Sequence, residues 1–347
     1  MTLAYGVLAQ GGVCARVDDR VVDLSGLDPV FAERSLNAFM ARGPEFWTEA
    51  RARLTDGEEV TAPSLAMPLE VADYVDFYSS LHHAENVGRM FRPDAEPLLP
   101  NWRHLPVGYH GRSGTVVPSG TPVRRPHGQR AAPDFGPSRA LDIELEAGFV
   151  IGLPSRRGEP VPIESALDHV FGMVLVNDWS ARDIQAWEYR PLGPFLGKSF
   201  ATSVSHWVVP LSELEALRVP AAPQAPEPLP YLREPPWAYD IPLEVELNGT
   251  VVARSNTRHL YWSVAQQLAH LTSNGASLRT GDLLATGTIS GPEREQRGCL
   301  LELSWNGEEP IQLPDGSTRS FLEDGDEVVL RGEPLGEVRG RVEPAGG

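Results

Sequence analysis

The stretch Leu141-Asp-Ile-Glu-Leu-Glu-Ala-Gly-Phe-Val150 alternates apolar and acidic residues over its first six positions. Successive side chains of a β-strand point to opposite faces, so the three apolar residues are predicted to face a core. Asp142, Glu144 and Glu146 then share the other face, where neighbouring carboxylates repel each other unless a positive charge lies between them. A divalent cation with oxygen ligands would supply that charge. The alternative for this segment alone is an ordinary solvent-facing strand.

A second apolar run and a polar segment follow. Residues 171–177 (FGMVLVN) form a continuous apolar run that predicts a buried strand. Asp178, Arg182, Gln185 and Tyr189 come next at spacing i, i+4, i+7 and i+11, which predicts one face of a helix with Asp178 at or near its N-cap. A carboxylate, a guanidinium, an amide and a phenol on one face favour a site. A surface helix with an Asp–Arg pair is the alternative.

The segment DYVDFYSSLHH at residues 73–83 combines carboxylates, phenols and two adjacent histidines. Adjacent helical residues do not share a face, so one histidine acting as an acid/base group is favoured over His82 and His83 both binding a metal. A histidine base needs an orienting carboxylate, which spacing alone does not locate. The alternative is a histidine on the surface or satisfied within the core.

The segment GPFLGKS at residues 193–199 differs from a phosphate-binding loop, because three rather than four residues separate its glycines. It also does not directly follow an apolar strand, so we exclude a nucleotide site. Gly197 permits close backbone approach, which would let Lys198 reach into a site. A solvated loop lysine is the alternative. Two glycine-rich loops, residues 100–112 and 284–292, are predicted to border a cleft.

Composition narrows the functional class. The chain has 347 residues, is 41% hydrophobic and carries a net charge of −17, which argues against nucleic acids and anionic membranes as partners. Cys14 and Cys299 form neither a disulfide framework nor a zinc spacing, as expected for a cytoplasmic protein. The N-terminal residues lack signal-peptide features, and no apolar run approaches the ~20 residues of a membrane-spanning helix.

Turn and periodicity signals predict a β-rich α+β chain in two parts. Residues 1–66 are predicted to form a small domain, with strands near 4–8 and 21–24, a helical stretch near 36–54 and a linker at 61–64. Residues 67–347 are predicted to form the larger domain, with a hairpin at Asn248-Gly249 and a helix over residues 264–271. Further turns are expected at Asn306-Gly307, Asp315-Gly316 and Asp324-Gly325, and an irregular proline-rich surface loop at residues 222–237.

Four segments together closely resemble the fumarylacetoacetate hydrolase family. They are DFYSS (76–80), PNWRHLPVGYHGR (100–112), NDWSARDIQAWEYRPLGPFLGKSF (177–200) and GDLLATGTISGPE (281–293). The resemblance extends from about residue 73 to residue 332. It points to the fumarylacetoacetase branch, because the wider superfamily of acylpyruvases, decarboxylases and hydratases shares the carboxylates but not the long run at 177–200.

The resemblance implies a small SH3-like N-terminal domain, a large mixed β-roll catalytic domain and a homodimer. The implied substrate is a small diketo dicarboxylic acid. The implied activity is hydrolysis of the carbon–carbon bond of 4-fumarylacetoacetate to fumarate and acetoacetate, the last step of tyrosine and phenylalanine catabolism. The alternatives are an acylpyruvate hydrolase or decarboxylase of the same superfamily, and a non-catalytic calcium-binding module.

The resemblance also assigns roles to individual residues. His83 would be the general base, oriented by Glu302. A divalent Ca²⁺ or Mg²⁺ ion would bind the four carboxylates of Asp76, Glu144, Glu146 and Asp178. The developing oxyanion would be surrounded by Arg182, Gln185 and Lys198. The substrate would be held by Tyr78, Arg92, Tyr109, Gln185, Tyr189 and Thr288. A second ion, Mg²⁺ or monovalent, would lie near Asp178, Lys198 and Thr202.

This chain departs from the family pattern in two places. Ala201 stands where the family usually has a glycine in the KSFGT run, next to the expected second ion. The N-terminal domain is also shorter than in animal members of the family.

Overall fold

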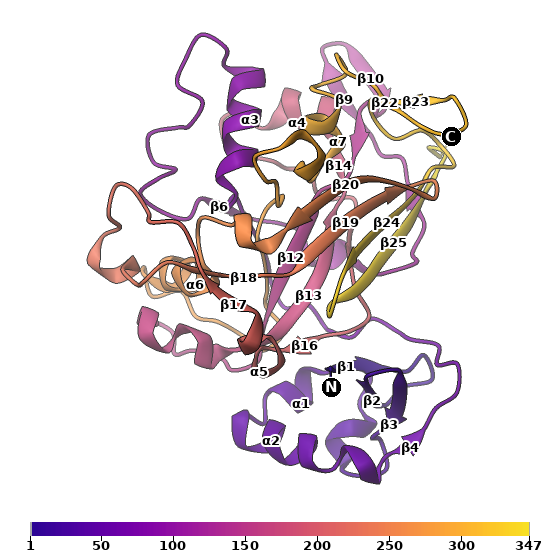
Figure 1. The fold of residues 1–347 in the computed structure, drawn as a ribbon, viewed down its shortest axis with the longest axis vertical. Helices are drawn as coiled ribbons and strands as arrows, with labels where there is room; N and C mark the ends of the chain where they lie inside the picture. The colour runs from indigo at the N-terminus through magenta and orange to yellow at the C-terminus, as the bar shows by residue number, and fades with distance from the viewer. Residues whose placement is uncertain (1, 347) are drawn as a thin grey trace.

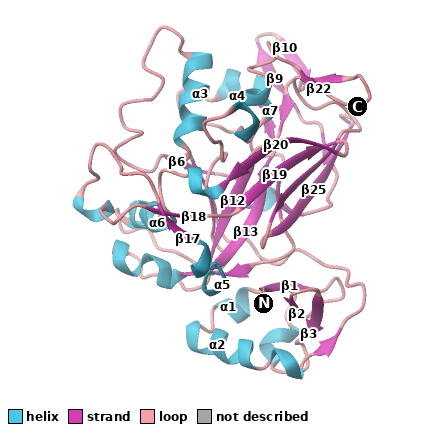
Figure 2. Cartoon of the chain, viewed as in Figure 1, coloured by secondary structure: helices cyan, strands magenta, loops and turns pink. Residues whose placement is uncertain are grey.

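An eight-stranded mixed sheet forms the centre of the molecule in the computed structural model, which describes residues 2–346 (Figures 1 and 2). Its strands are β5 (Tyr74–Phe77), β6 (Gly108–His110), β7 (Val116–Pro118), β12 (Leu145–Ile151), β13 (Val170–Asp178), β15 (Thr202–Val204), β16 (Val209–Pro210) and β21 (Leu283–Ala285). The order is β6-β5-β21-β12-β13-β15-β7, with β16 beside β13. The β5–β21 and β15–β7 pairs are parallel and the other pairs are antiparallel.

The two long central strands, β12 and β13, are buried along their whole length. The apolar run at 171–177 therefore forms the buried strand that the sequence predicts. The acidic stretch that precedes β12 is also buried, so the solvent-facing alternative for it is wrong. The strand is interrupted there: β11 (Leu141–Asp142) ends before Ile143, and β12 begins at Leu145.

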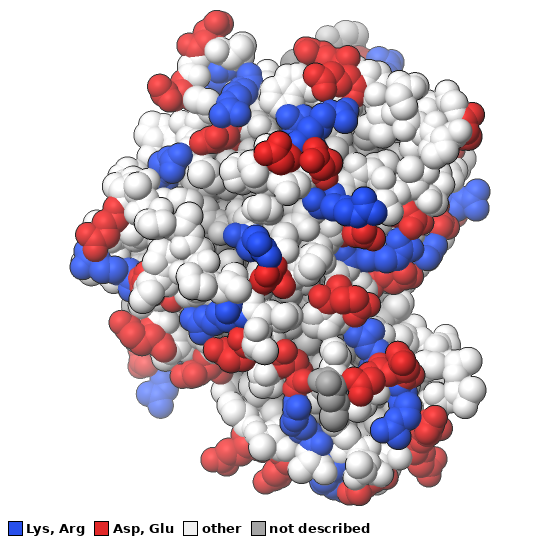
Figure 3. Space-filling model, viewed as in Figure 1, with Lys and Arg blue, Asp and Glu red and all other residues white. Residues whose placement is uncertain are grey.

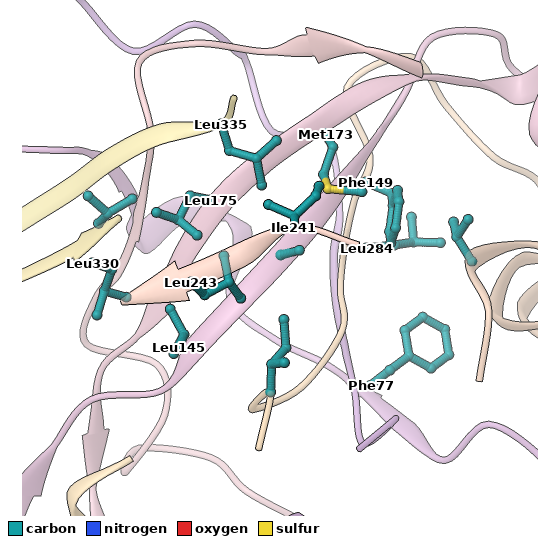
Figure 4. Packing of buried hydrophobic residues seen from close by; sticks show 14 of the residues in the cluster. Phe77, Leu145, Phe149, Met173, Leu175, Ile241, Leu243, Leu284, Leu330 and Leu335 are labelled. Carbon is teal, nitrogen blue, oxygen red and sulfur yellow. The ribbon is translucent and has the colours of Figure 1, made fainter. Parts of the chain in front are cut away.

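A second sheet of five strands, ordered β20-β19-β24-β25-β8, packs against the first. Its strands are β8 (Val123–Arg124), β19 (Pro242–Leu247), β20 (Thr250–Asn256), β24 (Glu327–Gly332) and β25 (Gly336–Glu343). Asn248 and Gly249 both have positive φ at the β19–β20 turn, as the Asn-Gly signal predicts. Figure 4 shows Leu145 and Leu175 of the first sheet facing Leu243 and Leu330 of the second, so the main core lies between the two sheets.

The N-terminal residues form a separate four-stranded sheet, ordered β1-β2-β3-β4 (lower part of Figure 1). Its strands are β1 (Leu3–Val7), β2 (Val13–Val17), β3 (Arg20–Asp23) and β4 (Glu58–Glu59). This sheet shares a hydrophobic cluster with Phe171, Val174 and Val176 of β13. Tyr5 and Val208 also exchange backbone hydrogen bonds of 2.9 and 2.8 Å. The boundary at residue 66 stays a prediction.

The single helical stretch expected over residues 36–54 is interrupted. The chain forms α1 (Asn37–Met40) and α2 (Pro44–Ala52) instead. Gly43 adopts a φ of +84° between them, a conformation outside the helical region, and Pro44 starts the new helix. The predicted helical stretch is therefore present, but it is divided into two helices.

The remaining helices and short strands surround the two sheets. The helices are α3 (Leu81–Phe91), α4 (Arg182–Glu188), α5 (Leu211–Leu214), α6 (Val264–Thr272) and α7 (Leu300–Leu303). The strands are β9 (His127–Ala131), β10 (Asp134–Pro137), β14 (Ser180–Ala181), β17 (Arg218–Pro220), β18 (Trp237–Tyr239), β22 (Ile311–Gln312) and β23 (Thr318–Arg319). Helix α6 agrees with the predicted helix. The proline-rich segment is largely irregular but includes the fully buried Leu232.

Helices α3, α4 and α7 gather at the end of the main sheet farthest from the N-terminal unit (Figure 1). Basic and acidic side chains are interspersed over the visible face of the molecule (Figure 3), although the net charge is −17. Within residues 2–346, no helix combines the length and the apolar character that a membrane span requires. The fold is mixed α/β, built on curled β-sheet, and agrees with the β-rich chain expected from the sequence.

Candidate active site

Four buried carboxylates meet across four neighbouring strands of the main sheet, in the order β5, β21, β12 and β13. Asp76 comes from β5, Glu146 from β12 and Asp178 from the end of β13, while Glu144 lies in the link that precedes β12. One carboxylate oxygen of each lies within 4.8 Å of the corresponding oxygens of the other three. The alternation of acidic residues therefore does place Glu144 and Glu146 together. The order of the strands in the sheet brings the carboxylates of Asp76 and Asp178 to the same place.

The charges of this cluster are only partly balanced by the protein. Burial, followed by the charge of Asp178, raises the pKa of Asp76 well above its usual range. Burial, followed by the charges of Asp76 and Glu144, does the same to the pKa of Glu146. Asp76 Oδ1 and Glu146 Oε1 are buried and accept no hydrogen bond from any described residue. Buried oxygen atoms without donors, in an all-carboxylate set, fit a hard divalent cation.

Lys198 supplies part of the missing positive charge. Its Nζ lies 2.5 Å from Glu144 Oε2 and 2.6 Å from Asp178 Oδ2, and the residue is only 4% exposed. Burial alone would lower the pKa of Lys198, but Asp178 and Glu144 outweigh it and raise the pKa, so the ammonium is retained. The solvated-lysine alternative is therefore wrong. Thr202 Oγ1 also donates to Asp178 Oδ1 at 2.9 Å.

Gly197 explains how the lysine reaches this position. A Cβ atom added to Gly197 would lie 2.7 Å from the backbone nitrogen of Gln185, which is closer than real Cβ contacts come. The loop before Lys198 therefore packs directly on the first turns of α4. This agrees with the close backbone approach expected at this glycine.

Arg182 links the carboxylate cluster to its surroundings. Its Nε donates to Asp142 Oδ2 at 2.8 Å, and its Nη1 donates to Glu144 Oε1 at 2.7 Å and to Gln185 Oε1 at 3.4 Å. Its Nη2 is buried and donates to no group within residues 2–346. One guanidinium nitrogen is thus left to bind a ligand.

The expected position of Asp178 at a helix N-cap is wrong. Asp178 is the last residue of β13, and Ala181 is the N-cap of α4. Between them, Ser180 and Ala181 form β14 and pair with Leu141 and Asp142 of β11. Helical spacing therefore does not relate Asp178 to Arg182. The two residues meet in the site because the strands bring them there.

A histidine–glutamate pair lies beside the cluster. His83 Nδ1, on α3, is 2.6 Å from Glu302 Oε2, on α7. Glu302 also accepts from Asn86 Nδ2 at 2.8 Å and from Ser290 Oγ at 2.7 Å. Burial would raise the pKa of Glu302, but the charge of His83 and these three hydrogen bonds outweigh it and lower the pKa to about 2. An ionised Glu302 would hold the proton on Nδ1 and leave Nε2 of His83 free to accept one.

The two adjacent histidines have different surroundings. The ring of His83 meets Tyr78 edge-on at 5.2 Å between ring centres, whereas the ring of His82 meets His259 at 6.0 Å. The two side chains therefore have different neighbours, and the acid/base role of one of them stays a prediction.

The structure does not bring all the residues expected to hold substrate to the carboxylate cluster. Tyr109 Oη lies 3.5 Å from Asp178 Oδ2, and the Thr288 hydroxyl is buried without a described partner. Arg92 caps α3 and donates through Nη2 to the carbonyl of Pro97, while its buried Nε has no described partner. Tyr189 lies at the C-cap of α4, is 37% exposed and stacks against the Arg190 guanidinium, so the structure leaves it outside the cluster. Their substrate roles stay predictions.

Sequence reasoning missed three residues of the site. Asn86 and Ser290 bind Glu302, and Asp142 binds Arg182. Asn86 follows His83 by one helical turn, a spacing that could have suggested a shared face. Asp142 belongs to the acidic alternation but was not assigned a role. Ser290 lies in a predicted cleft loop and carried no further signal.

The family model and the similar proteins found by comparison all point to the same family. The family model described as fumarylacetoacetate (FAA) hydrolase C-terminal matches residues 73–343. The fumarylacetoacetase of Homo sapiens is 46% identical over 399 aligned residues, covering 99% of this chain and 95% of the relative. The fumarylacetoacetase of Caenorhabditis elegans is 48% identical over 357 residues, covering 91% of this chain and 85% of the relative.

Solved structures share the architecture at low sequence identity. A fumarylacetoacetate hydrolase from Exiguobacterium antarcticum superposes with a TM-score of 0.66 at 20% identity, covering 99% of this chain and all of that one. A maleylpyruvate hydrolase from Sphingobium gives a TM-score of 0.62 at 17% identity, with the same coverage. These structures support the fold, and the family model and the relatives settle the family. The chain belongs to the fumarylacetoacetate hydrolase family.

Proposed function

We propose that this protein is a metal-dependent hydrolase that converts 4-fumarylacetoacetate and water to fumarate and acetoacetate. This is the last step of tyrosine and phenylalanine breakdown. Relatives named fumarylacetoacetase match nearly the whole chain. The observation that carries the proposal is the His83–Glu302 pair beside a buried carboxylate cluster that also holds Lys198 and Arg182. This arrangement would supply the reaction with a proton acceptor, fixed cations and a metal-binding set.

His83 would begin the reaction by accepting a proton from water at Nε2. Glu302 holds the opposite ring nitrogen at 2.6 Å and stabilises the imidazolium that forms. The resulting hydroxide would add to the carbonyl on the fumaroyl side of the substrate. General-base catalysis of this kind contributes about 10² to 10⁴ in rate.

Arg182 and Lys198 would stabilise the tetrahedral oxyanion that forms next. Arg182 is held by Asp142 and Glu144 so that Nη2 remains unpaired, and Lys198 keeps its ammonium between two carboxylates. Fixed donors in a site without water are each worth a few kcal/mol, roughly 3, toward the transition state. Collapse breaks the carbon–carbon bond and releases the acetoacetate enolate. A proton would then pass through Lys198 to the enolate carbon, and Lys198 would regain its proton from the imidazolium of His83, which holds the one taken from water.

The metal is proposed to be Ca²⁺ or Mg²⁺, held by Asp76, Glu144, Glu146 and Asp178. Lys198 and Arg182 offset part of the negative charge of the four carboxylates, although Arg182 also pairs with Asp142, and a divalent cation would offset two further charges. When bound, it would act as a Lewis acid for the diketone oxygens and hold them in place. A second ion beside Thr202 remains part of the proposal, with Ala201 as the departure next to it.

The substrate is proposed to contact Tyr78, Arg92, Tyr109, Gln185, Tyr189 and Thr288. Arg92 would pair with a carboxylate of the diketo dicarboxylic acid, and the buried Thr288 hydroxyl would donate to an oxygen of the chain. Tyr189 lies on the exposed segment after α4, so it would reach the substrate only if that segment closes over the site.

We further propose an SH3-like N-terminal domain over residues 1–66, a β-roll catalytic domain over 67–347, a cytoplasmic location and a homodimer. The exposed apolar side chains Leu192, Phe195 and Leu196 offer a surface that a second copy would cover. Light scattering at micromolar concentration tests this: a mass twice that of the 37.9 kDa chain is expected, and a monomer would refute the dimer.

The experiment that tests the activity compares two substrates with the purified protein. Fumarylacetoacetate and a short acylpyruvate are each supplied at equal concentration, and the products are identified by chromatography. Fumarate and acetoacetate should form, with kcat/KM for the acylpyruvate at least roughly tenfold lower because it leaves the Arg92 guanidinium unpaired. Preference for the acylpyruvate would favour that reaction instead. No turnover of either would favour a non-catalytic module.

A further inference from the structure

The fully buried Asp142 connects the two halves of the site. Its Oδ2 accepts from Arg182 Nε at 2.8 Å and from the backbone nitrogen of Leu301 at 3.0 Å. Its Oδ1 accepts from the backbone nitrogens of Leu300 at 2.7 Å and Ile143 at 2.8 Å. Both oxygens are therefore in use, and the partners belong to α4, α7 and the link between β11 and β12 that contains Glu144.

Helix α7 depends on this carboxylate for its N-terminus. The helix runs from Leu300 to Leu303, and its N-cap residue Cys299 makes no capping hydrogen bond with its side chain among the described residues. Asp142, from β11, accepts from the first two helical N–H groups in its place. A helix of four residues has little stability of its own. Its position, and that of Glu302 within it, is set by contacts such as this one.

The same carboxylate fixes the orientation of Arg182. Asp142 holds Nε and Glu144 holds Nη1, so the plane of the guanidinium is defined by two charge-assisted hydrogen bonds. The remaining Nη2 then points to one place only. A neutral residue at position 142 would leave Arg182 with a single carboxylate partner and free to rotate about it.

We infer that Asp142 is a positioning residue that holds the oxyanion-binding Arg182 and the base-orienting Glu302 in one fixed arrangement. This inference rests on the proposed function. Asp142 itself is separated from the reacting atoms by Arg182 on one side and by α7 on the other. Its effect on the reaction must therefore pass through these two groups, and a purely structural role would not produce that coupling.

The test compares Asp142→Asn with Asp326→Asn as a matched control. Asp326 is also buried, binds the guanidinium of Arg319 at 2.9 and 3.0 Å and accepts from the backbone nitrogen of Glu323 at 2.8 Å, but it lies in the turn before β24. Asp142→Asn should lower kcat roughly 10- to 100-fold, as loss of a supporting partner does, with little change in KM. Asp326→Asn should retain the wild-type kcat.

A double-mutant cycle with Arg182→Met separates coupling from independent damage. If Asp142 acts through Arg182, the loss in the double variant should be at least roughly twofold smaller than the product of the two single losses. Losses that multiply would overturn the inference, as would equal kcat values for Asp142→Asn and Asp326→Asn. If Asp142→Asn does not fold, Asp142→Glu retains the charge but displaces it by one methylene. Its kcat should fall, and a wild-type kcat would overturn the inference.

A spectroscopic measurement tests the role of Asp142 without relying on the proposed activity. Proton NMR of the wild-type protein with ¹⁵N-labelled histidine should show a far-downfield Nδ1–H signal from the short His83–Glu302 bond. This signal should weaken or move upfield in Asp142→Asn and persist in Asp326→Asn. An unchanged signal in Asp142→Asn would show that α7 does not depend on Asp142. Absence of turnover by the wild type, in contrast, would refute only the activity.

Discussion

Lys198 shows how a single buried cation organises the chemistry of this site. It neutralises the facing oxygens of Glu144 and Asp178, while Asp76 Oδ1 and Glu146 Oε1 remain without donors. An isolated buried charge would be very costly, so the cation and the carboxylates must be retained together. The unpaired oxygens are the positions at which we propose that an ion binds. The unpaired nitrogen of Arg182 is the group that we propose for a substrate oxygen.

His83→Ala is the substitution that tests the base. The variant should lose about 10² to 10⁴ in kcat, because no other group accepts the proton of the attacking water. KM should change little, since other side chains are proposed to bind the substrate. Steady-state kinetics with fumarylacetoacetate provides the measurement, and His82→Ala is the matched control that should keep most activity. A kcat near that of the wild type for His83→Ala would remove His83 from the role of base.

The sequence located some site residues better than others. Alternation places Glu144 and Glu146 together because the period of a strand is a local property. The pairing of His83 with Glu302 spans 219 residues and was implied only by family resemblance. Asp142 was missed because its partners, Arg182 and the N-terminus of α7, are set by tertiary packing.

At the scale of elements, the strand-to-helix junction after β13 brings two residues of the site, Asp178 and Arg182, close together in the chain. Asp178 ends the strand, Ser180 and Ala181 pair with β11, and Arg182 starts α4. Periodicity predicted a helix from Asp178 because strand and helix spacings both allow residues four apart to share a face. The pairing partner, residues 141–142, is distant in sequence and could not be inferred from the local pattern.

Gly197→Ala tests how tightly α4 and the Lys198 loop are joined. The new Cβ would lie 2.7 Å from the backbone nitrogen and 2.9 Å from the Cα of Gln185, so the backbone must shift. We expect a stability loss of about 1–3 kcal/mol from overpacking, together with a lower kcat because Lys198 moves. Chemical unfolding and kinetics measure the two effects. Gly114→Ala is the control, since its Cβ would meet nothing within 4 Å, and equal behaviour of the two variants would refute the close packing.

At the scale of the whole molecule, the two sheets and the N-terminal unit pack against one another through shared hydrophobic clusters. The central strands β12 and β13 contribute one set of apolar residues to the core between the sheets and another to the cluster shared with β1 and β2. The strands that carry the carboxylates are thus packed on both faces. The order of the strands, with β21 between β5 and β12, could not be read from local sequence because it depends on long-range pairing.

The buried Asp282, which directly precedes β21, should give the stability of the protein a defined pH dependence. Burial raises its pKa from 3.8 to about 6, although the backbone N–H and the charge of Arg279 oppose the shift. Between these two pH values the unfolded chain has lost the proton while the folded protein keeps it. The free energy of unfolding attributable to Asp282 therefore falls as the pH rises through this window, and it is constant above it.

Asp282→Asn removes this dependence, because the amide does not ionise and its oxygen can still accept from Arg279. Urea unfolding of the variant and the wild type at pH 4 and pH 7 provides the measurement. The free energy of unfolding of the variant, relative to that of the wild type, should be larger at pH 7 than at pH 4. A difference between the two proteins that does not change with pH would mean that the Asp282 carboxyl titrates normally in the folded state.

One experiment tests whether the reaction depends on an ion held by the carboxylate cluster. The protein is depleted of divalent ions with EDTA, and the loss of fumarylacetoacetate absorbance is followed before and after Ca²⁺ or Mg²⁺ is restored. Calorimetry follows ion binding to the wild type and to Glu146→Gln in parallel. Depletion should abolish turnover, the ion should restore it, and Glu146→Gln should bind the ion more weakly. Full turnover after exhaustive depletion would show that the four carboxylates do not hold a catalytic ion.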